Sequence, residues 1–309
     1  MGLRRLQALV DQLISSAPAA AKAATGEVPV DTSQFRENAH ESDRVAGGRM
    51  ELTPEQVATY REKGWVTPTQ FRFPPETLER IKGEHARFVE RYADSHPEFA
   101  DYCGAILNYD LGFLNYARDP DILNMVAQCI GPDIGLWNSS FFAKPPQTGR
   151  EVPWHQDGQY WAIRPLATCT VWIAVDGATR ENGCLRMIPG SHAAQELVPH
   201  ETIHDPQNLA LAQKTIGVDD SVAEDLILEP GQISLHDIFL VHGSEPNLSD
   251  RPRRGLTLRY FPTTSLYDRE IAGQDYGSNV PDGGHGHTLF LMRGVDHANN
   301  DWQVHNQMA

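Results

Sequence analysis

Cysteine is scarce in this chain, and the cysteines present do not occur in close pairs. The 309 residues include Cys103, Cys129, Cys169 and Cys184, and none of them belongs to a CxxC motif. Widely spaced cysteines of this kind are typical of reduced, mostly buried thiols and not of a disulfide framework. We therefore expect a reducing compartment and a cytoplasmic location.

Long apolar runs are also absent, and no segment of the sequence is long enough to span a bilayer. The first residues, MGLRRLQALVDQLISSAPAAAKA, place Gln7, Asp11 and Gln12 within their apolar part, which makes a poor signal-peptide core. Leu6 stands where a myristoylation pattern needs Ser or Thr, and the final QMA is not a peroxisomal address. We expect no membrane partner.

Positive charge is in short supply. The chain has 26 Lys and Arg against 41 Asp and Glu, which gives a formal net charge of −15. A nucleic-acid-binding protein needs a basic face, so this balance argues against a nucleic-acid partner. Acidic soluble enzymes are common, and the partner that we expect is a small-molecule substrate.

Helical patterns fill the chain from about residue 51 to 132. The segment LTPEQVATYREKGW begins with Thr53 as an N-cap, has Pro54 in the first turn and Gln56 to complete a capping box, and ends at Gly64. Two further helices are predicted over 74–97 and 119–133. Residues 1–50 are predicted to form an N-terminal helix followed by a loosely ordered arm.

Beyond residue 133 the pattern changes to short apolar runs separated by turn residues. The runs IGLWNSSFFA, CTVWIAVD and RGLTLRYFPT are examples, and several of them alternate with period two. Many short strands of this kind favour an antiparallel barrel or jelly roll. We predict a single domain over 51–309, with a helical part at 51–132, a jelly-roll core at about 133–265 and a covering segment at 266–309.

The stretch WHQDGQYW contains a histidine and a carboxylate two residues apart. In a strand, His155 and Asp157 would point to the same face and form two corners of a 2-His-1-carboxylate site for Fe(II). His242, at the end of the apolar run IFLVHGS, is the best candidate for the third ligand. Arg253 follows eleven residues later and could bind a carboxylate through two hydrogen bonds.

Other interpretations of these residues are open. An HxD pair also occurs without a metal, and a single histidine in an apolar strand is more often a core residue. His236 lies six residues before His242, an even spacing that puts residues of a strand on the same face. It could therefore replace His242 as a ligand, although a supporting role is favoured. The case for a metal rests on the ordered set of HxD, HGS and arginine.

This set resembles the phytanoyl-CoA dioxygenase family of Fe(II)- and 2-oxoglutarate-dependent oxygenases. The resemblance spans roughly residues 50 to 262 and is strongest in VPWHQDGQYWAIRP, VWIAVDGATRENGCLRMIPGSH and HDIFLVHGSEPNLSDRPRRG. It implies a double-stranded β-helix (a cupin-like jelly roll) with N-terminal helices. It also implies roles for individual residues: His155, Asp157 and His242 as iron ligands, and Arg253, Ser244, Trp172 and Ser140 around 2-oxoglutarate.

The activity implied is hydroxylation, or another oxidation at a C–H bond, of a small-molecule metabolite. Fe(II), 2-oxoglutarate and O₂ are the implied cofactor and cosubstrates, and succinate and CO₂ are released. Asp157 argues against a halogenase, because related halogenases carry a small residue at this position. The alternatives are a cupin-type dioxygenase without 2-oxoglutarate, a zinc hydrolase or a binding jelly roll, and none of them needs Arg253.

Several further residues receive weaker assignments. Four residues after the metal motif could line the substrate site: Gln159, Tyr160, Trp161 and Arg164. Arg254 could substitute for Arg253, and Lys144 could be structural or neutralise an anionic substrate. His285 and His287 lie among glycines, which favours an exposed loop over a second metal site.

Overall fold

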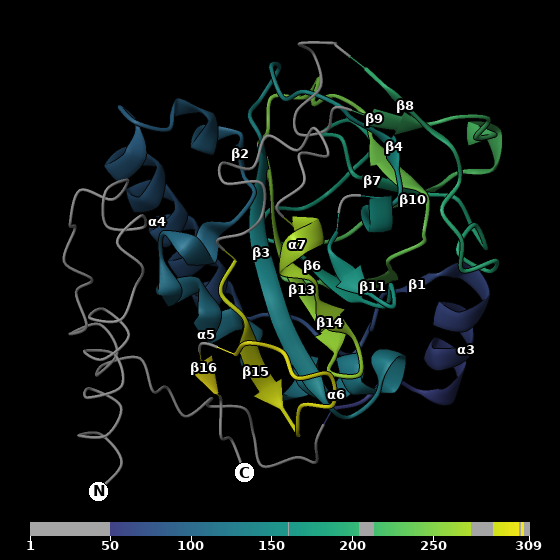
Figure 1. Cartoon of the computed structure of the whole chain (residues 1–309). Helices are drawn as coiled ribbons and strands as arrows, with labels where there is room; N and C mark the ends of the chain where they lie inside the picture. Colours follow the sequence, from purple (N-terminus) through teal and green to yellow (C-terminus); the bar gives the residue numbers. More distant parts are fainter. Residues whose placement is uncertain (1–49, 160, 204–212, 273–286, 303, 306–309) are drawn as a thin grey trace, which may run out of the picture. The chain divides into compact units, whose positions relative to one another are not determined.

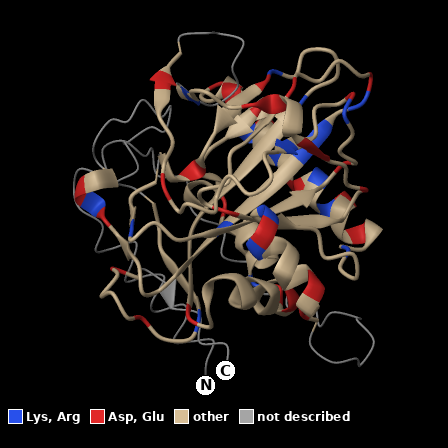
Figure 2. Ribbon diagram, turned by 90° about the vertical axis from the view of Figure 1, so that its right-hand side faces the viewer, with Lys and Arg blue, Asp and Glu red and all other residues tan. Residues whose placement is uncertain are grey.

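The computed structural model describes residues 50–159, 161–203, 213–272, 287–302 and 304–305. Arm residues 1–49, together with Tyr160 and His285, lie outside these ranges. In the described part, no helix has the length and apolarity that crossing a membrane requires. Acidic and basic positions are intermingled in the view of Figure 2.

The three predicted helices are confirmed. Helix α3 (Pro54–Lys63) begins at Thr53, whose hydroxyl accepts from the Gln56 amide while the Gln56 side chain bonds back to the cap, and it ends at Gly64 with a φ of 92°. Helices α4 (Pro75–Tyr92) and α6 (Pro120–Ile130) follow. Two shorter α-helices and five 3₁₀ helices complete the set in the described chain: α5 (Leu114–Ala117), α7 (Arg269–Ala272), η2 (Pro97–Ala100), η3 (Ile106–Asn108), η4 (Leu111–Phe113), η5 (Asp157–Gln159) and η6 (Asp220–Val222).

The larger sheet has eight strands in the order β1-β11-β6-β13-β3-β15-β16, with β2 also paired to β3. All of its pairs are antiparallel except β15 with β16. The strands are β1 (Trp65–Val66), β11 (Ile233–Asp237), β6 (Cys169–Ala174), β13 (Arg253–Pro262), β3 (Ile134–Lys144), β15 (Phe290–Arg293), β16 (Val304–His305) and β2 (Tyr102–Cys103). In Figure 1, β3 and β13 run through the middle of the described chain, with α4 on one side.

A second sheet of four strands has the order β10-β7-β12-β4. Its members are β10 (Glu224–Leu226), β7 (Leu185–Met187), β12 (His242–Ser244) and β4 (Val152–His155). Two hydrogen-bonded strand pairs complete the set: β14 (Leu266–Tyr267) with β5 (Ile163–Arg164), and β8 (His200–Thr202) with β9 (Gln213–Thr215). The predicted fold, mainly β with flanking helices and an antiparallel jelly-roll core, is confirmed.

The two faces of β13 have different surroundings. Leu256, Leu258 and Tyr260 belong to the main apolar cluster, which also contains Ile81 and Phe88 of α4. This burial of apolar area against the helices is the main favourable contribution to the stability of the sheet. Arg253, Thr257 and Arg259 alternate with these residues and lie on the opposite face.

The polar face of β13 is shared by the neighbouring strands. Thr257 is the register partner of Trp172 on β6 and of Ser140 on β3. A Cβ atom on Gly255 would lie 2.3 Å from the Trp172 ring, so the close approach of the indole requires glycine at this position. The larger sheet therefore carries a buried polar surface on the side away from the main core.

Candidate metal centre

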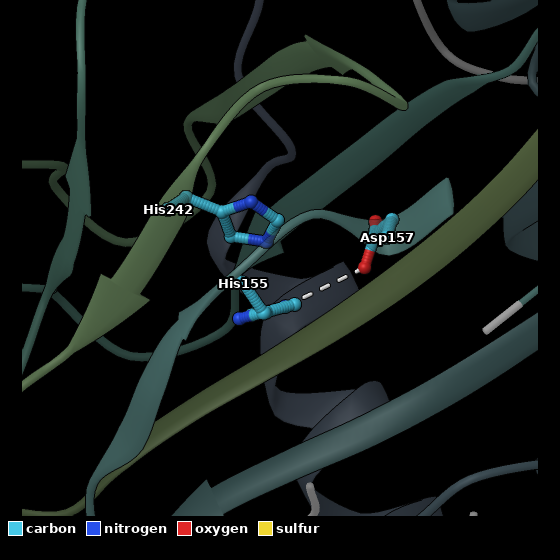
Figure 3. Close-up of side chains that lie close together, drawn as sticks. All are labelled: His155, Asp157 and His242. Carbon is cyan, nitrogen blue, oxygen red and sulfur yellow. Dashed lines mark ion pairs between the residues drawn. The ribbon is translucent and has the colours of Figure 1, made fainter. Parts of the chain in front are cut away.

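Three potential ligands converge where the smaller sheet ends. His155 is the last residue of β4 and His242 the first residue of β12, and the two are register partners in the antiparallel pair. Their ring centroids are 4.2 Å apart. Asp157 completes the group, with one ligand atom from each residue lying within 4.8 Å of the others. All three side chains are buried, and Figure 3 shows them facing a common point.

Backbone carbonyls fix the orientation of both imidazoles. The Nδ1 atom of His155 lies 2.8 Å from the Pro153 carbonyl oxygen, and that of His242 lies 2.9 Å from the Leu240 carbonyl oxygen. Because a carbonyl only accepts hydrogen bonds, Nδ1 carries the proton in each ring. The Nε2 atom of each ring is then the one available to a metal, which is the arrangement that metal-binding histidines use.

The geometry of Asp157 differs from the one expected for a strand. Strand β4 ends at His155, and Asp157 begins the 3₁₀ helix η5. The chain turns because the intervening Gln156 is anchored away from the site, where its amide donates to the Phe239 carbonyl over 2.7 Å. The two side chains thus meet through a turn, with 3.5 Å between His155 Nε2 and Asp157 Oδ1, and not through strand alternation.

The protonation states suit a divalent metal. Burial alone would raise the pKa of Asp157, but hydrogen bonding to His155 and His236 brings it well below its usual value, so the carboxylate is ionised. Burial, with the neighbouring His155 adding to it, lowers the pKa of His242 well below its usual value, so this ring is neutral. Two imidazoles and one carboxylate form the donor set that Fe(II) takes in a facial triad.

His236 supports the carboxylate from the other sheet. Its Nε2 atom is 3.7 Å from Asp157 Oδ2, and its ring centroid is 4.9 Å from that of His242. The Thr170 hydroxyl donates to the same oxygen over 3.4 Å. His236 thus lies beside the carboxylate, outside the group of three potential ligands found among the described residues.

Two buried cations lie at the start of β13. Arg253 is only 1% exposed; its Nε donates to the Gly183 carbonyl over 3.1 Å, and its guanidinium lies 5.6 Å from the Trp172 ring centre. Its register partner on β3 is Lys144, which is completely buried. The lysine Nζ donates to the Ser244 hydroxyl over 2.7 Å and also to the Glu245 carbonyl.

This pair of cations has no carboxylate partner within the described ranges. Burial lowers the pKa of Arg253 to about 10. Burial and the nearby Arg253 lower the pKa of Lys144 well below its usual range. A buried charge without a counter-charge is costly, so this end of the site favours an anion. The sequence suggested Arg253 for this role and left Lys144 as either structural or anion-neutralising, and the strand register places Lys144 beside Arg253.

The remaining candidates are dispersed. The Ser140 hydroxyl donates to the Gly104 carbonyl over 2.8 Å and accepts a hydrogen bond from Arg259. Gln159 donates to Gln213 over 3.0 Å. Trp161 is buried in an apolar cluster. Arg164 is exposed and donates to the Trp161 and Ile163 carbonyls, which places it outside the buried site.

The expectation of an exposed loop is wrong for His287. Its side chain is 4% exposed and its ring lies 5.2 Å from that of Trp137. The carbonyl of His287 accepts from Arg269 over 2.6 Å, which holds the segment against the protein. Burial lowers the pKa of His287 to about 3, so its ring is neutral. The glycines around it suggested exposure because tertiary contacts are invisible to local composition.

Comparisons with known proteins agree on one family. A model of the phytanoyl-CoA dioxygenase (PhyH) family matches residues 60–255. A phytanoyl-CoA dioxygenase domain-containing protein 1 homolog of Dictyostelium discoideum is 36% identical over 263 residues, which is 69% of this chain and 92% of the relative. The peroxisomal phytanoyl-CoA dioxygenase of Homo sapiens is 29% identical over 242 residues, 70% of each chain. The structure of CytC3 with Fe(II) and alpha-ketoglutarate has a TM-score of 0.56 at 22% identity and covers 82% of this chain and 92% of its own.

Proposed function

Because the chain belongs to the phytanoyl-CoA dioxygenase family, as its motifs predicted, we propose that its buried triad binds Fe(II) for the oxidation of a small-molecule metabolite. The protein is an Fe(II)- and 2-oxoglutarate-dependent dioxygenase, and the expected reaction is hydroxylation. The single observation that carries the proposal is the convergence of two buried imidazoles and one ionised carboxylate. Residues 51–309 act as one catalytic domain in this proposal, and the cytoplasmic location stays a prediction.

Each residue of the site has a defined task in this proposal. His155, Asp157 and His242 would hold Fe(II), and three protein ligands would leave coordination positions for 2-oxoglutarate and O₂. When bound, the iron supplies the electrons that activate O₂, coupled to conversion of 2-oxoglutarate to succinate and CO₂. His236 and Thr170 orient Asp157, and the two backbone carbonyls orient the imidazoles.

The buried cations select the cosubstrate. Arg253 binds the distal carboxylate of 2-oxoglutarate, and Trp172 forms the wall of the site against the guanidinium. Lys144 holds the Ser244 hydroxyl at the same end, where its Nζ donates over 2.7 Å. A zinc hydrolase or a cosubstrate-independent cupin dioxygenase has no use for these two cations, and this observation favours the 2-oxoglutarate enzyme.

An anaerobic titration tests the proposal. Fe(II) and 2-oxoglutarate added to the apoprotein should produce a weak visible charge-transfer band, because the keto acid chelates the iron through its carboxylate and ketone oxygens. Succinate in place of 2-oxoglutarate, or Zn(II) in place of Fe(II), should leave the sample colourless. Admission of air should then release succinate in step with the loss of the band. A protein that stays colourless with Fe(II) and 2-oxoglutarate would refute the assignment.

A further inference from the structure

A third buried cation, Arg259, is not used by the metal or by the distal carboxylate of 2-oxoglutarate. It is 6% exposed and lies six residues after Arg253 on the same face of β13. Its Nη1 atom donates to the Ser140 hydroxyl, but its Nε atom has no hydrogen-bond partner in the described part of the chain. It also forms no ion pair with any residue of the described ranges, in contrast to Arg254, which pairs with Asp176 at 2.7 Å.

Aromatic rings surround this guanidinium. Its central carbon lies 5.1 Å from the Trp161 ring centre and 5.9 Å from that of Phe142. Trp137 packs against Trp161 with ring centres 4.9 Å apart, and its Nε1 atom is buried without an acceptor. Trp137 also precedes Asn138, the register partner of Arg259. Two buried N–H donors, each next to Trp161, thus lack acceptors among the described residues, although buried donors are almost always satisfied.

The charges of the assembled site leave Arg259 uncompensated. Asp157 balances one of the two charges on Fe(II), and the 2-oxoglutarate dianion balances the other together with Arg253. A protonated Lys144 would only add to the positive excess. One further negative charge is therefore needed close to Arg259 for a site that is buried and neutral.

We propose that Arg259 binds the carboxylate of the primary substrate, with Trp137 as a second donor; this inference rests on the proposed function. The substrate is then an amphiphilic monocarboxylate whose apolar part lies against Trp161 and Phe142. Guanidinium and carboxylate form a charge-assisted pair, and the indole adds a directional contact. The reactive C–H bond is positioned toward the iron because the carboxylate is fixed at Arg259.

The test compares carboxylates with their uncharged amides. Phenylacetate, hexanoate and butyrate are each titrated against the corresponding amide, with the anaerobic protein–Fe(II)–2-oxoglutarate charge-transfer band as the readout at saturating 2-oxoglutarate. In the wild-type protein at least one carboxylate should perturb the band at about tenfold lower concentration than its amide, as expected for loss of one charge-assisted hydrogen bond. The same pairs are measured by calorimetry on the metal-free protein.

Two variants and one control assign the preference to this site. Arg259→Gln should abolish the carboxylate preference while the half-saturating concentration of 2-oxoglutarate stays within about twofold. Trp137→Phe removes only the indole donor and should weaken carboxylate binding by roughly fivefold, as for one neutral hydrogen bond. Arg254→Gln removes another cation of the same strand, one that is already paired with Asp176, and should change neither quantity.

The outcomes separate this inference from the proposed function. Absence of the band in the wild-type protein refutes the 2-oxoglutarate assignment, whereas the calorimetric comparison still decides whether Arg259 is an anion site. An equal response to all three carboxylates and their amides in the wild type overturns the inference. So does a carboxylate preference that survives in Arg259→Gln. A tenfold rise in the half-saturating 2-oxoglutarate concentration in that variant would show that Arg259 binds the cosubstrate instead.

Discussion

The two faces of β13 are built from alternate residues of one strand, yet they have opposite chemistry. On one face Leu256, Leu258 and Tyr260 are completely buried among apolar side chains of the helices. On the other face Arg253 and Arg259 are nearly as buried, but neither has a carboxylate partner in the described chain. A strand can therefore stabilise the fold through one set of residues and carry recognition through the alternate set.

The difference teaches where function lies in this molecule. Apolar burial contributes favourably on its own, whereas a buried unpaired cation costs free energy until an anion arrives. Buried groups that cost stability are expected mainly at functional sites. On the polar face of β13, Arg253 and Arg259 are buried without a carboxylate partner in the described chain, and the metal triad lies beside this face. Substitutions on the two faces should accordingly affect different measurements.

The largest expected effect is on the metal triad. Asp157→Ala removes the only carboxylate among the three ligands, so 2-oxoglutarate turnover should fall by about a thousandfold or more, since even residues that merely support ligands are worth about 10–100-fold. The measurement is succinate release under air. Asp176→Ala is the matched control, because its carboxylate pairs with Arg254 away from the triad. Near-normal succinate production by Asp157→Ala would contradict the assignment of the ligand.

The extent to which the site was predictable depends on sequence distance. His155 and Asp157 are separated by one residue, so a short motif could suggest that they act together, although their actual geometry uses a turn anchored by Gln156. Arg253 was suggested by its place after His242. Lys144 joins Arg253 through the register of β3 and β13, and Arg259 meets Trp161 through tertiary packing. Neither contact can be inferred from the spacing of residues along the sequence. The expectation for His287 was wrong for the same reason, because its burial depends on tertiary contacts.

The apolar face gives the next effect, on stability. Leu258→Ala removes a completely buried side chain from the main cluster and leaves a cavity, so the free energy of unfolding should fall by about 3 kcal/mol. Denaturant unfolding followed by circular dichroism measures this change. Leu248→Ala, at a position that is 72% exposed, should change it by less than about 0.5 kcal/mol. Equal effects at both positions would contradict the described packing of β13.

A slightly smaller effect is expected at the cosubstrate end of the polar face. Arg253→Met should raise the KM for 2-oxoglutarate roughly hundredfold, because the distal carboxylate loses a charge-assisted bidentate contact. Unfolding free energy should not decrease, since the substitution also removes an unpaired buried charge. Arg254→Met provides the adjacent control and should leave the KM unchanged. A variant of Arg253 with unchanged KM would remove this arginine from the cosubstrate site.

The smallest effect concerns two buried histidines, one near each face. His85 stacks on Phe141 with ring centres 3.8 Å apart, and burial lowers its pKa to about 4; the pKa of His287 is lowered to about 3. Both rings are neutral in the folded protein, so below pH 6.5 the unfolded chain binds protons that the folded chain does not. Stability is therefore complete above this pH and falls as the pH decreases towards 4.

Each histidine should account for about 2 kcal/mol of the stability lost between pH 7 and pH 5. Ionised carboxylates with lowered pKa, such as Asp157, lose their contribution only at lower pH, which keeps this window clear of them. Denaturant unfolding of the metal-free protein at both pH values should show a loss that is smaller by this amount in His85→Leu than in the wild type. An unchanged loss would mean that His85 is protonated in the folded state, and its stacking on Phe141 would then have to accommodate a charged ring.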